Sequence, residues 1–292
     1  MNKPLRMLPA ASAILFLAGV LFATTSAPAS MYDDKMKPED LIAKHLESIG
    51  SAQARAAAVT REITGKAVVT FRQGGRGQLY GDARLLSDHA STLTSMIFDN
   101  IDYPHEKMGY DGKRLTVTQV KPGVRSLFGR YLLTNQVPFS EGLIGGTLSP
   151  GWALLDVARK APKLKYDGIK KIDKRELHQL KYAPRKNEDL VITLFFDPQT
   201  FQHVRTRYHQ LIDPKIGSNR PADSLEEQET RIDIVEEFSD FRTEAGLTLP
   251  HTYKITLAIE GRSTVVYDWV LTLTQFTFGQ AIDPREFNVD AE

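Results

Sequence analysis

The sequence predicts a mainly β protein, in which roughly ten antiparallel strands form a barrel or a sandwich. Three observations predict this class. Apolar and polar residues alternate with a period of two in many short runs separated by turn residues. A single amphipathic helix stands before the first run, and a helical segment at about 122–160 interrupts the series. No internal repeat or linker divides the chain after the N-terminal segment, so we expect one domain over residues 30–292.

The clearest group of strands lies between residues 174 and 211, where two short turns at 183–187 and 197–200 separate three runs of strand character. Turns this short pair each run antiparallel with the next one. Side chains alternate between the two faces of a strand. In the first run this places together His178, Leu180 and Tyr182. In the last run we expect one face to hold Val204, Thr206 and Tyr208, and the other His203, Arg205, Arg207 and His209.

Further strands are expected at 60–73, 79–86, 92–98, 105–110, 115–119, 230–241, 251–260 and 263–278. The glycine-rich stretch 74–77 joins two of them and lacks the Lys-Ser/Thr of a phosphate-binding loop, so we interpret it as a hairpin turn. The polar segment 213–229 is expected to be an exposed loop.

The helix before the strands begins at Pro38, because the first helical position does not need a backbone N–H. Apolar side chains at helical spacing follow, and Gly50 is a natural end. This stripe is expected to pack over the sheet.

The interrupting segment is rich in apolar side chains. On one side of a first helix we expect Leu127, Phe128, Tyr131, Leu132 and Leu133. Ser149 and Pro150 predict the start of a second helix, which would carry Trp152, Leu154, Leu155 and Val157. A glycine-rich stretch at 142–146 joins them. Two interpretations stay open: a lid over the sheet, or ordinary core packing.

The N-terminus has the features of an export signal. A basic start with Lys3 and Arg6 precedes an apolar run at 11–23 and a small-x-small site before Ser30. Residues 1–29 are therefore predicted to be a cleaved signal peptide, because the run is shorter than the 20 or so residues that a membrane anchor needs. The expected location is the periplasm, with no lipid modification.

Composition excludes several classes of function. The chain has no cysteine, so it forms no disulfide, thiolate metal site or lipidated N-terminal cysteine. With 37 basic and 36 acidic residues it has no basic surplus for nucleic acid. Its histidines show no metal-ligand spacing, and no G-x-S-x-G or HExxH motif is present. We expect no cofactor, no metal and no enzyme activity; an exported hydrolase is the less favoured alternative.

The layout resembles the LolA/LolB-like superfamily of periplasmic lipoprotein carriers. The stretches that support this resemblance are DLIAKHLESIG, SLFGRYLL, EGLIGGTLSPGWALL and DLVITLFFDPQTF. The resemblance implies an unclosed antiparallel barrel with a helical lid over an apolar cavity for acyl chains. This chain is longer than a minimal carrier of that type, and none of its arginines can be matched to a ligand-gripping position of the family.

The function expected from this resemblance is to carry a lipid or a lipidated protein, with the sorting of outer-membrane lipoproteins as the expected role. We expect the protein to be a monomer. The alternative is a protein-binding module of envelope assembly or stress on the same scaffold. An apolar cavity needs no polar motif, so its lining is predicted from the alternation and from the insertion. The predicted ligand-binding residues are Val69, Phe71, Leu127, Phe128, Leu132, Leu143, Trp152, Leu155, Leu180, Tyr182, Ile192, Leu194, Phe196, Tyr253, Ile255, Leu257, Trp269 and Leu271.

Overall fold

A computed structural model describes Met1 and residues 36–185, 189–213 and 229–291. The chain divides into two units, Met1–Asp33 and Asp34–Glu292, and the fold described below belongs to the second. Apart from Met1, the predicted signal peptide lies outside the described residues, as does most of the polar loop at 213–229. Within the described part of the chain, no helix is both long enough and apolar enough to span a membrane.

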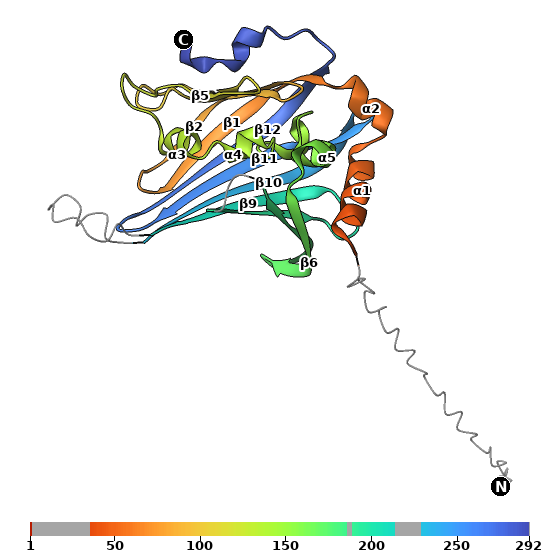
Figure 1. The fold of residues 1–292 in the computed structure, drawn as a ribbon. Helices are drawn as coiled ribbons and strands as arrows, with labels where there is room; N and C mark the ends of the chain where they lie inside the picture. The colour runs from red at the N-terminus through yellow and green to blue at the C-terminus, as the bar shows by residue number, and fades with distance from the viewer. Residues whose placement is uncertain (2–35, 186–188, 214–228, 292) are drawn as a thin grey trace. The chain divides into compact units, whose positions relative to one another are not determined.

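Twelve strands form a single antiparallel sheet (Figure 1). They are β1 (Thr60–Gln73), β2 (Gln78–Asp88), β3 (Ser91–Phe98), β4 (His105–Tyr110), β5 (Leu115–Val117), β6 (Lys163–Ile172), β7 (Arg175–Ala183), β8 (Leu190–Phe196), β9 (His203–Ile212), β10 (Thr230–Glu244), β11 (Leu247–Glu260) and β12 (Thr264–Phe278). The spatial order is β5-β4-β3-β2-β1-β12-β11-β10-β9-β8-β7-β6. Because β5 and β6 are edges that do not pair with each other, the sheet is unclosed, as expected.

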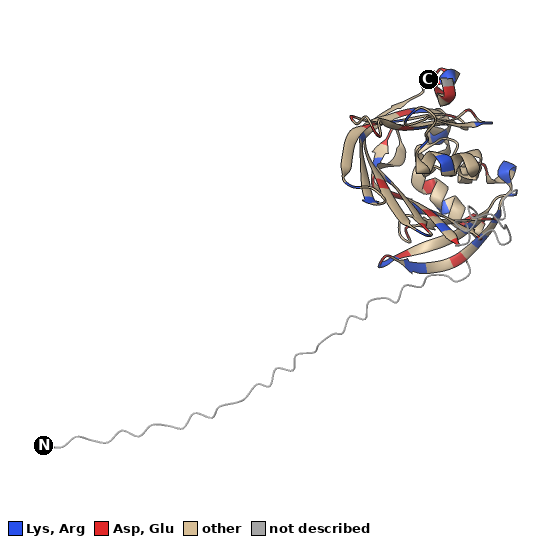
Figure 2. Cartoon of the chain, turned by 90° about the vertical axis from the view of Figure 1, so that its left-hand side faces the viewer, with Lys and Arg blue, Asp and Glu red and all other residues tan. Residues whose placement is uncertain are grey.

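The insertion, which we define as residues 118–162, runs from one edge of the sheet to the other. It leaves β5 and enters β6, and these are the two edge strands. Its short helices are α3 (Leu127–Thr134), α4 (Val137–Ser140), η1 (Gly146–Leu148), η2 (Ala153–Asp156) and α5 (Val157–Lys160). Figure 2 shows these helices within the curve of the sheet. The insertion therefore covers the inner, concave face.

The N-terminal helix forms as predicted. Helix α1 (Pro38–Ile49) begins with Pro38 and ends at Gly50, whose φ of 140° suits a residue without a Cβ. Its buried stripe includes Leu41, His45 and Ile49. A short second helix, α2 (Ala52–Ala57), follows after Ser51, whose side chain accepts a hydrogen bond from Ala54 N.

The second helix predicted in the insertion is wrong in its start. The helix does not begin at Ser149 and Pro150, because the backbone of Trp152 is extended (φ −47°, ψ 128°) and regular helix starts only after it, with η2. Ala153 N donates to Gly142 O at 2.9 Å, rather than to the carbonyl of Ser149 as an α-helix would require. This contact joins the two halves of the insertion.

The predicted facing of β9 is wrong at its first two residues. The register between β8 and β9 shifts at Phe195/Phe196, which places an extra residue in β9. His203 is therefore buried on the concave face, and Val204 packs on the convex face with Leu177 and Phe195. From Thr206 onward the predicted alternation holds, with Tyr208 buried.

Strand β6 was not expected from the sequence. Its residues KLKYDGIKKI include four lysines and a glycine, and the register shifts between Tyr166 and Ile169. Lysines and a bulge are usual on an edge strand, because both discourage pairing with another chain. The segment lacks the even apolar alternation that identified the other strands.

The convex face is covered near β2 and β3 by the C-terminal segment. Two short helices, η4 (Pro284–Phe287) and η5 (Val289–Ala291), place Phe287 and Val289 against Leu86 and Leu93. Arg84 donates to Glu286 at 2.9 Å across this contact.

Candidate functional site

The contact between the insertion and the concave face is the candidate site. The structure brings all of the predicted ligand-binding residues into or against one apolar cluster. Most of them are fully buried; three that remain partly exposed are Phe71, Leu127 and Leu155. In this structure their side chains fill the concave face, and ligand binding by these residues stays a prediction.

Aromatic rings join the insertion to the sheet at two places. Phe128 of α3 stacks on Trp269 of β12 with ring centroids 5.1 Å apart. Trp152 stacks on His203 of β9 at 4.6 Å. Such pairs add about 0.5–1.5 kcal/mol each to the effect of burying their area. The apolar contact is therefore strong at both ends of the insertion.

Glu106 of β4 binds the start of α3. The Ser126 hydroxyl donates to Glu106 Oε1 at 2.7 Å and accepts from Gly129 N at 2.8 Å, so one serine both caps the helix and ties it to the sheet. The Tyr103 hydroxyl donates to the other carboxylate oxygen. Burial raises the pKa of Glu106 to about 7, although these donors favour the charged form.

Glu236 of β10 binds the middle of the insertion. Gly145 N donates to Oε1 at 2.8 Å, the Tyr253 hydroxyl donates to Oε1 at 2.5 Å, and the Tyr208 hydroxyl donates to Oε2 at 2.7 Å. The carboxyl is fully buried. Burial raises its pKa to about 7 against the opposing effect of the three donors.

Two further polar contacts hold the segment on either side of Gly145. Buried Arg61 of β1 donates to Thr147 O at 2.7 Å and to Ala58 O at 3.0 Å. The Tyr182 hydroxyl of β7 donates to Glu141 Oε2 at 2.6 Å. Burial lowers the pKa of Arg61 to about 10, because its partners are neutral carbonyls rather than carboxylates.

His45 of α1 completes the set. Trp152 Nε1 donates to His45 Nε2 at 2.9 Å, so the proton of the ring must be on Nδ1, which lies 3.0 Å from Phe201 O. Burial lowers the pKa of His45 to about 4. The insertion is thus tied to α1 by a histidine that must be neutral.

Glu106 and Glu236 were not predicted from the sequence, although the alternation contains their signal. Glu236 stands between Ile234 and Phe238 on the apolar face of β10, and Glu106 stands on the same face of β4 as Met108. A lone acidic residue in an apolar alternation marks a buried carboxyl. What the alternation does not contain is the partner, which lies in the insertion.

The histidines do not form a metal site in the part of the chain that the structure describes. No group of three or more His, Asp or Glu side chains there is close enough to hold a metal ion. His45 and His203 have ring centroids 6.2 Å apart. Both nitrogens of His45 have protein partners, and His203 Nε2 pairs with the Thr206 hydroxyl.

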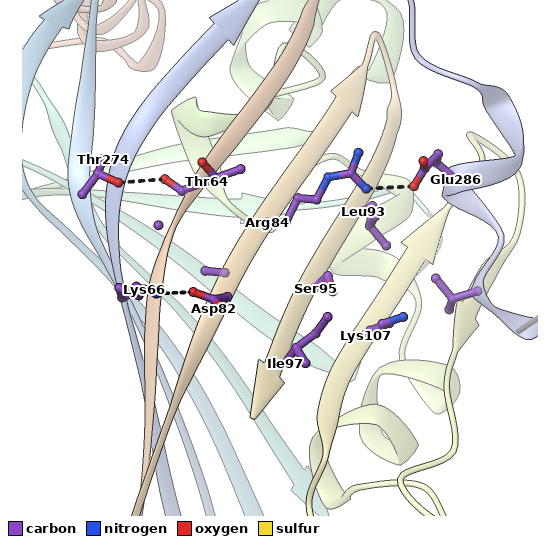
Figure 3. Close-up of a pocket in the computed structure, with 13 residues that line it drawn as sticks. Thr64, Lys66, Asp82, Arg84, Leu93, Ser95, Ile97, Lys107, Thr274 and Glu286 are labelled. Atoms are coloured by element: carbon purple, nitrogen blue, oxygen red, sulfur yellow. Dashed lines mark hydrogen bonds and ion pairs between the residues drawn. The ribbon is translucent and has the colours of Figure 1, made fainter. Parts of the chain in front are cut away.

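A second hollow lies on the convex face (Figure 3). It is an open groove of about 510 Å³ between β1, β2, β3 and β4 on one side and the C-terminal segment on the other. Ion pairs of Lys66 with Asp82 and of Arg84 with Glu286 cross it. Ile97, which is 53% exposed, lies at its end.

Comparison with known proteins gives likenesses in structure alone. No family model matches the chain. No curated protein matches it either. Among solved structures, the chain is similar to a LolA superfamily protein from Nitrosomonas europaea, with 11% identity, a TM-score of 0.46, and coverage of 88% of this chain and 100% of the other.

Two further structures are similar at the same level. A putative outer membrane lipoprotein-sorting protein domain from Vibrio parahaemolyticus has 12% identity, a TM-score of 0.43, and coverage of 86% of this chain and 98% of the other. A DUF1329 family protein from Desulfovibrio piger has 12% identity, a TM-score of 0.42, and coverage of 87% and 98%. The matches include the superfamily that the sequence resembles.

Proposed function

We propose that this chain is a periplasmic carrier or binding protein for a lipid or for the acyl chain of a lipidated protein. The observation that carries the proposal is the position of the insertion. It joins the two free edges of an unclosed sheet and covers an apolar concave face. An apolar ligand can take the place of the insertion on that face without any change in the order of strands.

The energetics support exchange of one apolar cover for another. Each methylene that a ligand buries contributes about 0.8 kcal/mol, so a long acyl chain offsets the loss of several apolar side chains of the insertion. The side chains that would have to leave include Phe128, Leu132 and Trp152, all fully buried in the closed structure. The lid function and the core packing are then two states of the same segment.

The two tryptophans provide the test, because Trp269 is on the sheet and Trp152 is on the insertion. The protein is titrated with a brominated long-chain fatty acid in two variants, Trp152→Phe and Trp269→Phe, each of which retains one tryptophan. Bromine quenches an indole that it contacts. We expect quenching of Trp269, with the unbrominated acid as the control.

Two outcomes decide the matter. Saturable quenching of Trp269, together with a lipid that co-purifies at near one per protein in native mass spectrometry, supports a carrier. Absence of both quenching and co-purifying lipid overturns the proposal. The alternative function, binding of a protein partner, would then be the one to test.

That alternative is a protein-binding module. The convex groove and the exposed side chains beside it, Tyr80 (68% exposed) and Ile97, favour it. Replacing Tyr80 and Ile97 with serine would weaken capture of a protein partner and leave the uptake of fatty acid unchanged.

A further inference from the structure

Glu236 is an unusual group to find in the middle of an apolar face. Its hydrogen bonds and ion pairs join it to two tyrosine hydroxyls and one backbone amide, and to no lysine or arginine among the described residues. Its neighbour Glu237, on the other face of β10, pairs instead with Lys254 at 3.2 Å and Arg205 at 3.6 Å. Burying a carboxyl without a cation is costly, and a nonpolar side chain would avoid the cost.

The three donors to Glu236 come from two different parts of the molecule. Tyr208 and Tyr253 belong to β9 and β11, the strands on either side of β10. The amide of Gly145 belongs to the insertion. When the insertion leaves the concave face, both tyrosines stay and the third donor is lost. When the insertion opens, the Glu236 carboxyl is therefore left without one of its three hydrogen-bond donors.

Gly145 has the geometry of a replaceable contact. It contacts Glu236 with its backbone N–H, and its φ is 76°. The space beside its Cα is open, because an added Cβ would meet nothing within 4 Å. Ser126, in contrast, binds the other buried carboxyl with a side chain that also caps α3. Both glutamates are buried, but of the two only Glu236 accepts a hydrogen bond from a backbone amide of the insertion. An N–H of a ligand can take the same place.

The surroundings favour a cation over an anion. Two of the three donors to the carboxyl are tyrosines, and the ring of one of them, Tyr253, stacks on Phe238 with centroids 5.1 Å apart and planes 4° apart. Aromatic faces attract ammonium groups. The buried cation that contacts the same turn, Arg61, is already bound to the carbonyl oxygens of Ala58 and Thr147.

A narrow cleft between the β2–β3 hairpin and the turn at Gly145 lies beside this place, with Tyr253 but not Glu236 on its walls. It has a free volume of about 20 Å³, and its walls include Tyr253 together with Ile144, Gly145 and Leu148 of the insertion. Widening it requires only that the turn at Gly145 move away from the sheet. The cleft marks the side from which a head group would enter.

We propose that Glu236, with the hydroxyls of Tyr208 and Tyr253, is the head-group subsite of the concave face, and that it selects apolar ligands ending in a primary ammonium. The inference rests on the proposed function and names the class of ligand. Gly145 N occupies the subsite in the closed structure. An ammonium replaces it with a charge-assisted hydrogen bond to the carboxylate.

The test compares three probes with the same chain: dodecylammonium, dodecanoate and 1-dodecanol, each below its micelle concentration. Binding to the full mature protein is measured by calorimetry, and by the fluorescence of Trp269 in the Trp152→Phe variant. We expect dodecylammonium to bind at least 10-fold more tightly than dodecanoate. Equal affinities, or a preference for dodecanoate, overturn the inference and leave the carrier function standing. If none of the three probes binds, the proposed function itself fails.

Two variants locate the preference. Glu236→Gln keeps the size of the side chain, and we expect it to lose the preference for dodecylammonium while binding 1-dodecanol within about 3-fold of the unchanged protein. Glu106→Gln is the matched control, because it removes the other buried carboxyl, and it should keep the preference. A preference that survives in Glu236→Gln assigns the head group elsewhere and refutes the subsite. Tyr253→Phe, which removes one donor only, is the second variant if Glu236→Gln does not fold.

Discussion

The indole of Trp152 and the imidazole of His45 form a hydrogen bond 2.9 Å long that joins the insertion to the N-terminal helix. The direction of the bond fixes the state of the histidine. Because the indole can only donate, His45 Nε2 must be without a proton. Protonation of His45 would place two N–H groups face to face, so this bond exists only while His45 is neutral.

The first prediction concerns acid. The pKa of His45 falls from 6.5 to about 4 because the ring is buried. Between these values the unfolded chain binds a proton that the folded chain does not, so the free energy of unfolding decreases as pH falls from 6.5 to 4. The expected contribution of this residue is about 3 kcal/mol. In His45→Gln this part of the decrease should be absent, as measured by urea denaturation at several pH values.

The control for this measurement is His209→Gln, because His209 lies on the convex face beside Asp233. If His45→Gln and the unchanged protein lose stability in parallel below pH 6.5, burial does not hold His45 neutral in the folded protein, and the prediction is wrong.

The second prediction concerns a loss of stability as the pH rises. Burial raises the pKa of Glu106 from 4.5 to about 7. Between these values the folded chain holds a proton that the unfolded chain has lost, so the free energy of unfolding decreases as pH rises. Glu106→Gln should remove about 3 kcal/mol of this decrease, measured by urea denaturation between pH 4.5 and 7. The same substitution at exposed Glu47 is the control, and identical slopes in the two variants would contradict the prediction.

The third prediction compares two neighbouring glycines with φ in the left-handed region. In Gly146→Ala the new Cβ would lie 2.9 Å from His203 Nδ1 and 3.0 Å from Phe238 Cζ, in addition to the strain of a φ of 51°. In Gly145→Ala only the backbone strain arises, since the Cβ would meet nothing within 4 Å. We expect Gly146→Ala to lower the free energy of unfolding by about 2–4 kcal/mol and Gly145→Ala by about 1 kcal/mol.

Thermal denaturation of the two variants in parallel measures the difference. Equal losses of stability would show that the turn moves freely away from His203 and Phe238, contrary to the packing in the closed structure.

The sequence predicted the sheet better than it predicted what covers the sheet. The strands were found where apolar residues alternate evenly, as in β11, and the turn at 197–200 was identified by Asp197, whose carboxylate accepts from Gln199 N and Thr200 N. Local patterns of this kind need no knowledge of distant residues. They fail where an extra residue shifts the phase, as at His203, and where an edge strand carries lysines, as in β6.

The candidate site could be predicted only in part for the same reason. The apolar side chains of the concave face follow from alternation within each strand. The polar contacts join residues far apart in the chain, such as Gly145 with Glu236 and Arg61 with Thr147, and no local pattern specifies such a pair. A buried charge can be suspected from one strand, but its partner requires the fold.

The last prediction tests whether the insertion must move for a ligand to enter. A Cβ added at Gly129 of α3 would lie 2.5 Å from Val117 Cγ1 of β5, so cysteines at these two positions are close enough to form a disulfide. The chain has no cysteine of its own, so the pair Val117→Cys/Gly129→Cys would form a single defined crosslink between α3 and the edge of the sheet. We expect the oxidised protein to take up brominated fatty acid at least 10-fold more slowly than the reduced protein, measured as quenching of Trp269 in a background that also carries Trp152→Phe. The reduced form of the same variant is the control, since it differs only in the crosslink. If both forms take up the fatty acid at the same rate, α3 stays in place during entry, and the opening is confined to the part of the insertion after Thr134.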